Sequence, residues 1–226
     1  MSEILIIIPA RSGSKRIKNK NIRIVKRKPL IYWTIKYAKK YAKNKDIVVS
    51  SDSKIIGKIA STEYVQFIKR PQRISKDKSS VYLTMTHVLK KIERKTNYKY
   101  IALLQPTSPL RPKNIIYDGL KLLKKNSRFQ NLVHLEKTNY HTGYIAKDNE
   151  WKSNYKNIIR GQEIVNQFRP SGCLFLYSTK NFENYNKFIK RKTYGFFDNN
   201  KFKTVNIDTE DDFIKLNSLI KNKNLI

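Results

Sequence analysis

The chain is short of cysteine, acidic residues and long apolar runs, and each shortage excludes a class of protein. A single cysteine, Cys173, among 226 residues rules out an internal disulfide, which agrees with a cytoplasmic protein. No apolar run approaches the roughly 18 residues that a membrane span needs. The N-terminus lacks the basic segment and the small-residue cleavage site of a signal peptide. The sequence therefore predicts a cytoplasmic globular protein without a membrane segment.

Several common catalytic patterns are also missing. The chain has neither the GxxxxGK[ST] spacing of a Walker A loop nor the GxGxxG of a Rossmann dinucleotide site. Its three histidines, His87, His134 and His141, have no histidine or cysteine partner at metal-ligand spacing. No Ser-His-Asp or Cys-His arrangement stands out, so covalent catalysis is not indicated and no general base is identified.

The scarcity of acidic residues gives the chain its net charge. There are 17 Asp and Glu against 48 Lys and Arg, for a formal charge of +31. A nucleic-acid-binding protein is one interpretation of this charge. The basic residues, however, lie along the whole chain and are accompanied by Asn, Ile and Tyr, which favours compositional drift in an AT-rich genome. An anionic substrate would benefit from the field in either case.

Hydrophobic patterning predicts strands that alternate with helices through about residue 126. Apolar runs at 3–8, 46–50, 65–68 and 100–104 read as strands, and helical stripes follow 29, 53, 81 and 112. A strand at 173–177 and a capping-box start at Thr209-x-x-Asp212 for a last helix complete the pattern. This order is typical of a mostly parallel sheet covered by helices in one domain, 1–226. Residues from about 131 to 165 are polar and irregular, and we interpret them as an insertion.

The most informative segment is the basic loop from Pro9 to Asn21. It follows the carboxyl end of the first buried strand, which is where ligands bind in open α/β sheets. One glycine and two serines allow a close backbone approach, and the basic side chains can converge on phosphate. A solvated basic loop would have the same composition, but its place after a buried strand favours phosphate binding.

The loop and five later segments carry a resemblance to a known family. "IPARSGSKRIKNKNI" resembles the opening motif of the acylneuraminate cytidylyltransferases, which activate nonulosonic acids as CMP-sugars. "VVSSDS", "RPQRISKDKSS", "LLQPTSPLR", "FRPSG" and "NIDTEDD" resemble the later motifs of that family, in order and over nearly the whole chain. The resemblance implies a Rossmann-like nucleotidyltransferase fold and the reaction of CTP with a 2-keto sugar acid to give CMP-sugar and pyrophosphate. It also implies a homodimer in which the insertion packs against the second subunit.

The resemblance assigns roles by position. For the nucleotide it implies the following residues: Arg11, Ser14, Lys15 and Lys20 on the triphosphate, Asn21 and Arg70 on cytosine, and Ser80 near the ribose. For the sugar it implies Gln105, Arg169, Tyr177 and Phe188. Arg11, Lys20 and Asp208 would be the catalytic residues, with Asp208 holding Mg²⁺ or another divalent cation.

Three departures from the family pattern affect these expectations. Asn206 stands where members commonly have a second Asp, which leaves less negative charge for the metal. Ser171 stands where sialic acid-activating members usually have Asn, and the loop Tyr140-His141-Thr142-Gly143 lacks their Lys. Both argue against assuming N-acetylneuraminate, and a legionaminic- or pseudaminic-type sugar is an equal candidate.

Three alternatives stay open at this point. A Kdo-type cytidylyltransferase would share the fold and the chemistry. A degenerate homologue would bind CTP without turnover, as Asn206 suggests. A basic nucleic-acid-binding protein would show strongly salt-dependent binding to a duplex.

Overall fold

A seven-stranded sheet forms the centre of the computed structural model, which describes residues 3–14, 16–92, 98–137, 143–145, 151–153, 168–184, 193–197 and 204–222. The strand order is β11-β7-β10-β6-β1-β4-β5. The strands are β1 (Ile4–Pro9), β4 (Ile47–Ser51), β5 (Gln66–Lys69), β6 (Tyr100–Leu103), β7 (Asn131–Lys137), β10 (Phe168–Ser178) and β11 (Thr193–Phe197). Neighbours are parallel, except that β10 runs antiparallel to both β6 and β7. The predicted mostly parallel α/β fold is confirmed.

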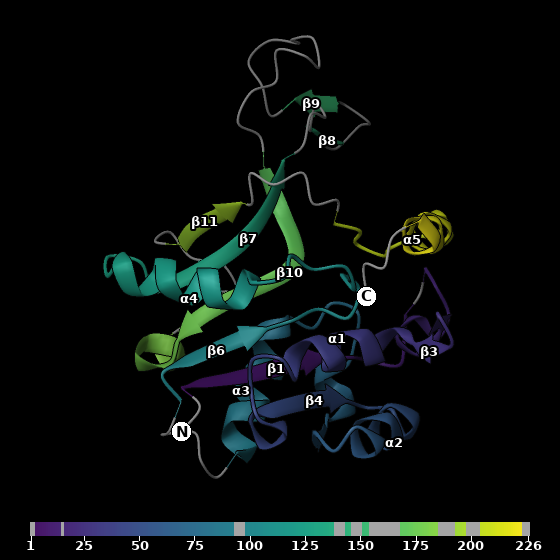
Figure 1. Cartoon of the computed structure of the whole chain (residues 1–226), viewed down its shortest axis with the longest axis horizontal. Helices are drawn as coiled ribbons and strands as arrows, with labels where there is room; N and C mark the ends of the chain where they lie inside the picture. The colour runs from purple at the N-terminus through teal and green to yellow at the C-terminus, as the bar shows by residue number, and fades with distance from the viewer. Residues whose placement is uncertain are drawn as a thin grey trace.

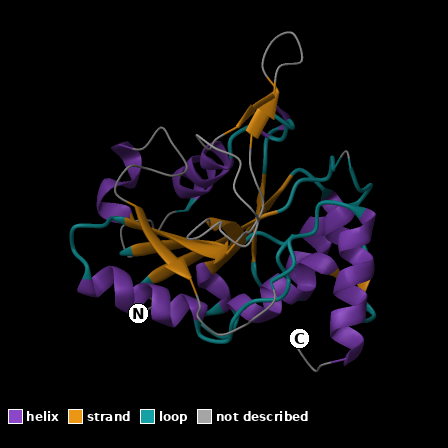
Figure 2. Cartoon of the chain, turned by 90° about the horizontal axis from the view of Figure 1, so that it is seen from above, coloured by secondary structure: helices purple, strands orange, loops and turns teal. Residues whose placement is uncertain are grey.

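Helices cover both faces of the sheet (Figure 2). Successive side chains of a strand point to opposite faces, and the buried strands are apolar at both sets of positions, so each face needs a cover. The even-numbered isoleucines of β1 pack with α1 (Leu30–Ala38), α2 (Lys54–Thr62) and α4 (Ile115–Lys125). Leu5 and Ile7 pack on the other face with α3 (Val81–Lys91). A third cluster joins α5 (Glu210–Asn222) to the first helix and to the basic loop through Phe213, Leu30 and Ile17.

The helix starts follow from local sequence. The Ser53 hydroxyl accepts a hydrogen bond from Ile56 N at 3.4 Å and caps α2, as predicted. Thr209 and Asp212 form the predicted capping box, since Asp212 Oδ2 accepts from Thr209 N at 2.8 Å and Thr209 Oγ1 from Asp212 N at 3.3 Å. The helix expected to begin at Pro112 starts three residues later, at Ile115.

The predicted insertion begins later than residue 131. Residues 131–137 are β7, which pairs with β10 and β11 inside the main sheet. A separate two-stranded sheet of β8 (Gly143–Ile145) and β9 (Trp151–Ser153) lies beyond the ends of β7 and β10 (Figure 1). The segment that we interpreted as one insertion therefore contains two different elements, a strand of the main sheet and a small projecting hairpin.

A second hairpin, which the sequence did not predict, follows the basic loop. Strands β2 (Ile24–Val25) and β3 (Lys28–Pro29) are joined by Lys26 and Arg27, whose φ angles are 46° and 62°. Two consecutive left-handed residues form the tight turn that matches strand twist, and glycine or asparagine usually occupies it. Within the described residues, no helix has the length and apolar character to cross a membrane.

Candidate active site

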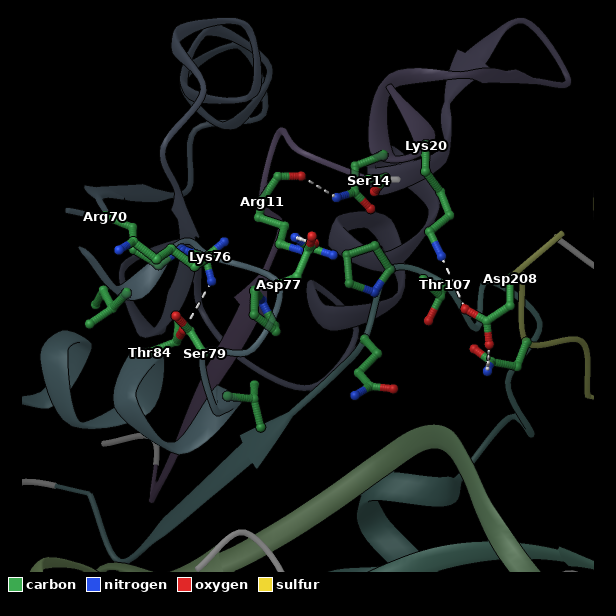
Figure 3. Close-up of a pocket in the computed structure, with 17 residues that line it drawn as sticks. Arg11, Ser14, Lys20, Arg70, Lys76, Asp77, Ser79, Thr84, Thr107 and Asp208 are labelled. Atoms are coloured by element: carbon green, nitrogen blue, oxygen red, sulfur yellow. Dashed lines mark hydrogen bonds and ion pairs between the residues drawn. The ribbon is translucent and has the colours of Figure 1, made fainter. Parts of the chain in front are cut away.

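A pocket of about 350 Å³ lies at the carboxyl ends of β1 and β6, where parallel strands of an α/β sheet present their loops (Figure 3). Most of the residues predicted to bind ligands line it: Arg11, Ser14, Lys20, Asn21, Arg70, Gln105, Asn206 and Asp208. They come from the loop after β1, the segment after β5, the end of β6 and the segment before α5. The fold thus brings together four of the six motifs, which are far apart in the sequence.

The loop after β1 is held by two aspartates. Asp52, just after β4, accepts hydrogen bonds from Ser12 N at 2.8 Å and from Ser12 Oγ at 2.6 Å. Burial raises the pKa of Asp52, but these hydrogen bonds and the charge of Arg70 outweigh it and leave the pKa lowered. Arg11 Nη1 forms an ion pair with Asp77 on the opposite wall of the pocket. These contacts hold Arg11 and Ser12 in place at the start of the loop.

Lys20 joins the loop to the segment before α5. Its ammonium donates to Ile207 O at 2.6 Å and to Asp208 Oδ1 at 3.2 Å, and its side chain is only 13% exposed. Asn206 Nδ2 donates to the other Asp208 oxygen at 2.9 Å. Because a carboxylate accepts and does not donate, this contact fixes the orientation of the Asn206 amide. Asp208 thus lies between a cation and an amide donor at the rim of the pocket.

Arg70 is buried at the other end of the pocket. It is 6% exposed, and Nη1 donates to Thr84 Oγ1 at 2.9 Å, while Nε and Nη2 are buried without a hydrogen-bond partner. Burial lowers the pKa of its guanidinium, and the Asp52 carboxylate opposes that shift. Buried donors without partners are costly, so these two N–H groups indicate a position where a ligand supplies acceptors.

Asn21 lines the same pocket as Arg70. Its side chain is buried, and Nδ2 donates to the Arg11 carbonyl at 2.9 Å. That contact commits the amide nitrogen to the protein backbone and leaves the amide oxygen to accept from a ligand.

Two predicted residues lie away from the pocket. Ser80 is exposed, and its hydroxyl accepts from Tyr82 N at 3.2 Å to cap α3, whereas its neighbour Ser79 lines the pocket. Arg169 has a 63% exposed side chain whose Nε donates to Glu136 across the β10–β7 pair at 2.6 Å. The structure assigns one a capping role and the other a cross-strand ion pair.

One further assignment from the second half of the chain, that of Tyr177 to the sugar, needs correction. Tyr177 is a buried core residue on β10, opposite Ile101 near the start of β6, whereas the pocket lies beyond the end of that strand. Ser171 is fully buried, and its hydroxyl lies 2.6 Å from His134 Nδ1. Ser171, at which the chain departs from the family pattern, does not line the pocket. Lys15, Phe188 and the loop 140–142 lie outside the described residues.

Sequence reasoning missed several residues of the pocket wall, namely Lys76, Asp77, Ser79, Thr84 and Thr107. Each stands inside or just beyond a quoted motif, so position in the motif was the available signal. Arg16 was missed in the same way. It lines an adjoining hollow of about 410 Å³ that shares Arg11, Ser14, Lys20 and Asp208 with the main pocket.

The described wall of the pocket offers few carboxylates to a metal ion. Within the described part of the chain, no group of three or more His, Cys, Asp or Glu side chains could enclose an ion. Asp77 and the half-exposed Asp208 are the carboxylates of the described pocket wall. This arrangement suits a hard cation such as Mg²⁺, which keeps several waters and uses one or two carboxylates plus substrate phosphates.

The chain is similar to several known proteins. Over 218 residues the chain is 29% identical to N-acylneuraminate cytidylyltransferase of Escherichia coli O18:K1:H7, covering 94% of this chain and 51% of that protein. Over 124 residues it is 38% identical to CMP-N,N'-diacetyllegionaminic acid synthase of Legionella pneumophila, covering 54% and 53%.

Among solved structures, CMP:2-keto-3-deoxy-manno-octonic acid synthetase complexed with CTP superposes with a TM-score of 0.70 at 16% identity, over 98% of this chain and 99% of that chain. The chain spans about half the length of the first curated relatives that it matches. A cytidylyltransferase family profile matches residues 5–226, and on this match the chain belongs to the cytidylyltransferase family.

Proposed function

We propose that the protein transfers CMP from CTP to the anomeric hydroxyl of a nonulosonic acid. The anomeric oxygen attacks the α-phosphorus, the bond to the β-phosphate breaks, pyrophosphate leaves, and the hydroxyl proton passes to water. The observation that carries this proposal is Arg70, whose two unpartnered buried donors share one pocket with the cations of the loop after β1. A base-recognition element and a phosphate-binding element thus lie within the reach of one nucleotide.

The base end of the pocket favours cytosine. Two adjacent N–H donors of Arg70 match the neighbouring O2 and N3 acceptors of cytosine, and the Asn21 amide oxygen can accept from its exocyclic amine. Uracil presents a donor at N3, which would face the donors of Arg70. The same groups therefore explain a preference for CTP over UTP.

The phosphate end supplies positive charge and hydrogen-bond donors. Arg11, Ser14 and Lys20 line both the main pocket and the adjoining hollow. Arg16 lines the adjoining hollow, where departing pyrophosphate would lie. Phosphoryl transfer needs positioning and charge neutralisation more than covalent help from the protein. The ion pair of Arg11 with Asp77 implies that CTP exchanges one anionic partner of Arg11 for another.

A divalent cation would complete the phosphate site. Asp208 would hold Mg²⁺ beside the phosphates, and Asn206 would orient Asp208 through its amide donor. Bound there, the ion supplies charge neutralisation to the triphosphate. Lys20, bonded to the same carboxylate, keeps it at the rim of the pocket.

The acceptor sugar is proposed by class. Gln105 lines the pocket at the end of β6 and is the residue that we assign to the sugar. Relatives named for neuraminic, legionaminic and pseudaminic acids match the chain at 29%, 38% and 28% identity over 218, 124 and 191 residues, so all three sugars are candidates. Because CTP is a cytosolic nucleotide, we place the reaction in the cytoplasm. We further propose a homodimer built on the β8–β9 hairpin.

Pyrophosphate release tests the proposal. The protein is mixed with Mg²⁺, each of the four NTPs in turn, and a panel of neuraminic, legionaminic, pseudaminic and 3-deoxy-octulosonic acids. Release that requires CTP and one nonulosonic acid is the expected result. Release with the octulosonic acid alone would reassign the substrate class, and CTP binding without any release would indicate a protein that has lost turnover.

A further inference from the structure

Gly172 lies against the loop that carries Gln105, in a conformation that favours glycine. Its φ is +76°, and it stands where β10 bulges between Pro170 and Phe175. A Cβ atom at this position would lie 2.5 Å from Ser108 Oγ and 2.8 Å from Gln105 Oε1. A larger residue would therefore be strained at this φ and would displace the ends of the Ser108 and Gln105 side chains.

The main chain of Gln105 is fixed from the other side by Arg111. This guanidinium is 5% exposed and donates from Nη2 to Gln105 O at 2.5 Å, from Nε to Cys173 O at 3.1 Å and from Nη1 to Thr34 Oγ1 at 3.1 Å. These acceptors are all uncharged, and burial lowers the pKa of Arg111. A planar fork of donors thus ties the end of β6 to β10 and α1.

Ser108 connects the same loop to the rim of the pocket. Its hydroxyl donates to Ser171 O at 2.9 Å and lies 3.4 Å from Asn206 Oδ1. One hydroxyl proton cannot serve both acceptors fully, so the shorter contact, next to Gly172, anchors the loop.

We propose that Gly172 is a positioning residue for the sugar half of the site. By having no side chain, it leaves the space that the Gln105 amide occupies, while Arg111 fixes the backbone of Gln105. The inference rests on the proposed function, in which Gln105 contacts the sugar. It also connects two of the motifs, because Gly172 of FRPSG and Arg111 of LLQPTSPLR both set the position of Gln105.

Gly172→Ala tests the inference through the two substrates separately. The KM for the sugar should rise by about tenfold, the equivalent of one hydrogen bond, because the new methyl group displaces the Gln105 amide. The Kd for CTP, measured by calorimetry, should stay within about threefold, because the residues assigned to the nucleotide do not contact Gly172. An unchanged sugar KM, or an equal loss of CTP affinity, would overturn the inference.

A double-mutant cycle separates positioning from general damage. If Gly172 acts through Gln105, then Gly172→Ala should raise the sugar KM by less than about twofold in a Gln105→Ala background, and full additivity contradicts this. If Gly172→Ala does not fold, Arg111→Lys decides by the same criteria, because lysine keeps the charge and loses the fork. Failure of the wild-type protein to release pyrophosphate with any nonulosonic acid would overturn the proposed function and this inference together.

Discussion

Replacing Arg70 by lysine tests whether the two unpartnered donors recognise the base. Lysine keeps the positive charge but cannot present two N–H groups in one plane. One hydrogen bond from a charged donor contributes ~1.5–3 kcal/mol, so its loss should lower kcat/KM for CTP by about 10- to 150-fold. UTP does not gain that bond in the wild-type protein, and its kcat/KM should change by less than about threefold. The preference for CTP over UTP should therefore fall by nearly the whole factor.

The measurement is pyrophosphate release at saturating sugar, with CTP and UTP varied in turn. Arg73→Lys is a matched control, because Arg73 is exposed on the same segment and does not line the pocket. If Arg70→Lys leaves the CTP to UTP ratio unchanged, or if Arg73→Lys lowers it equally, Arg70 does not recognise the base.

Stability gives an independent check on Arg70. Two buried N–H groups without partners cost about 1–3 kcal/mol each in the free protein, whereas the bond to Thr84 returns about 1 kcal/mol. Arg70→Met should therefore leave the melting temperature unchanged or raise it while abolishing turnover. A clear fall in melting temperature would show that Arg70 is retained for the fold.

Three further predictions concern charge and backbone strain. Arg11→Ala should lower kcat/KM by roughly 100-fold with an unchanged circular dichroism spectrum. The charge-matched control is Lys58→Ala, on an exposed face of α2. Near-normal turnover of Arg11→Ala would show that Arg11 does not act in the site. Asn206→Asp places a second carboxylate beside Asp208, so it should lower the melting temperature in the absence of Mg²⁺. Added Mg²⁺ should then raise the melting temperature of the variant by more than that of the wild type. An equal response of the two proteins would place the metal elsewhere. Arg27→Gly relieves a left-handed φ of 62° and should raise the free energy of unfolding by about 1 kcal/mol in urea; a decrease would contradict the strain.

The alternating strands and helices could be predicted because their signals are local. The β1 run and the capping residues Ser53 and Thr209 act within a few positions of themselves, and all of them form the predicted elements. The Lys26–Arg27 turn was missed because its sequence lacks the glycine or asparagine that such turns usually have. The extent of the insertion was misjudged because strand β7 combines buried apolar residues with buried Asn131 and His134.

The two halves of the candidate site differed in how well they could be predicted. The nucleotide half depends on loops that directly follow parallel strands, so Arg11 and Arg70 could be placed at the carboxyl ends of those strands from the order of the motifs. The sugar residues depend on the register of β10, and register is not visible in one sequence. The observed register puts Tyr177 in the core and pairs Arg169 with Glu136, which the spacing of the motifs could not reveal.

Although acidic residues are scarce in the chain, several of them lie at the candidate site. Of the 17 acidic residues, three lie beside the cations of the pocket: Asp77 pairs with Arg11, Asp208 pairs with Lys20, and the charge of Asp52 opposes the lowering of the Arg70 pKa by burial. A loop of unpaired cations would repel itself and scatter, whereas paired cations keep one geometry. Under the proposed function, a phosphate of CTP would replace Asp77 as the partner of Arg11, while Asp208 would stay beside Lys20 to hold the metal ion. The large net charge is therefore a poor guide to function, and the few carboxylates are the better one.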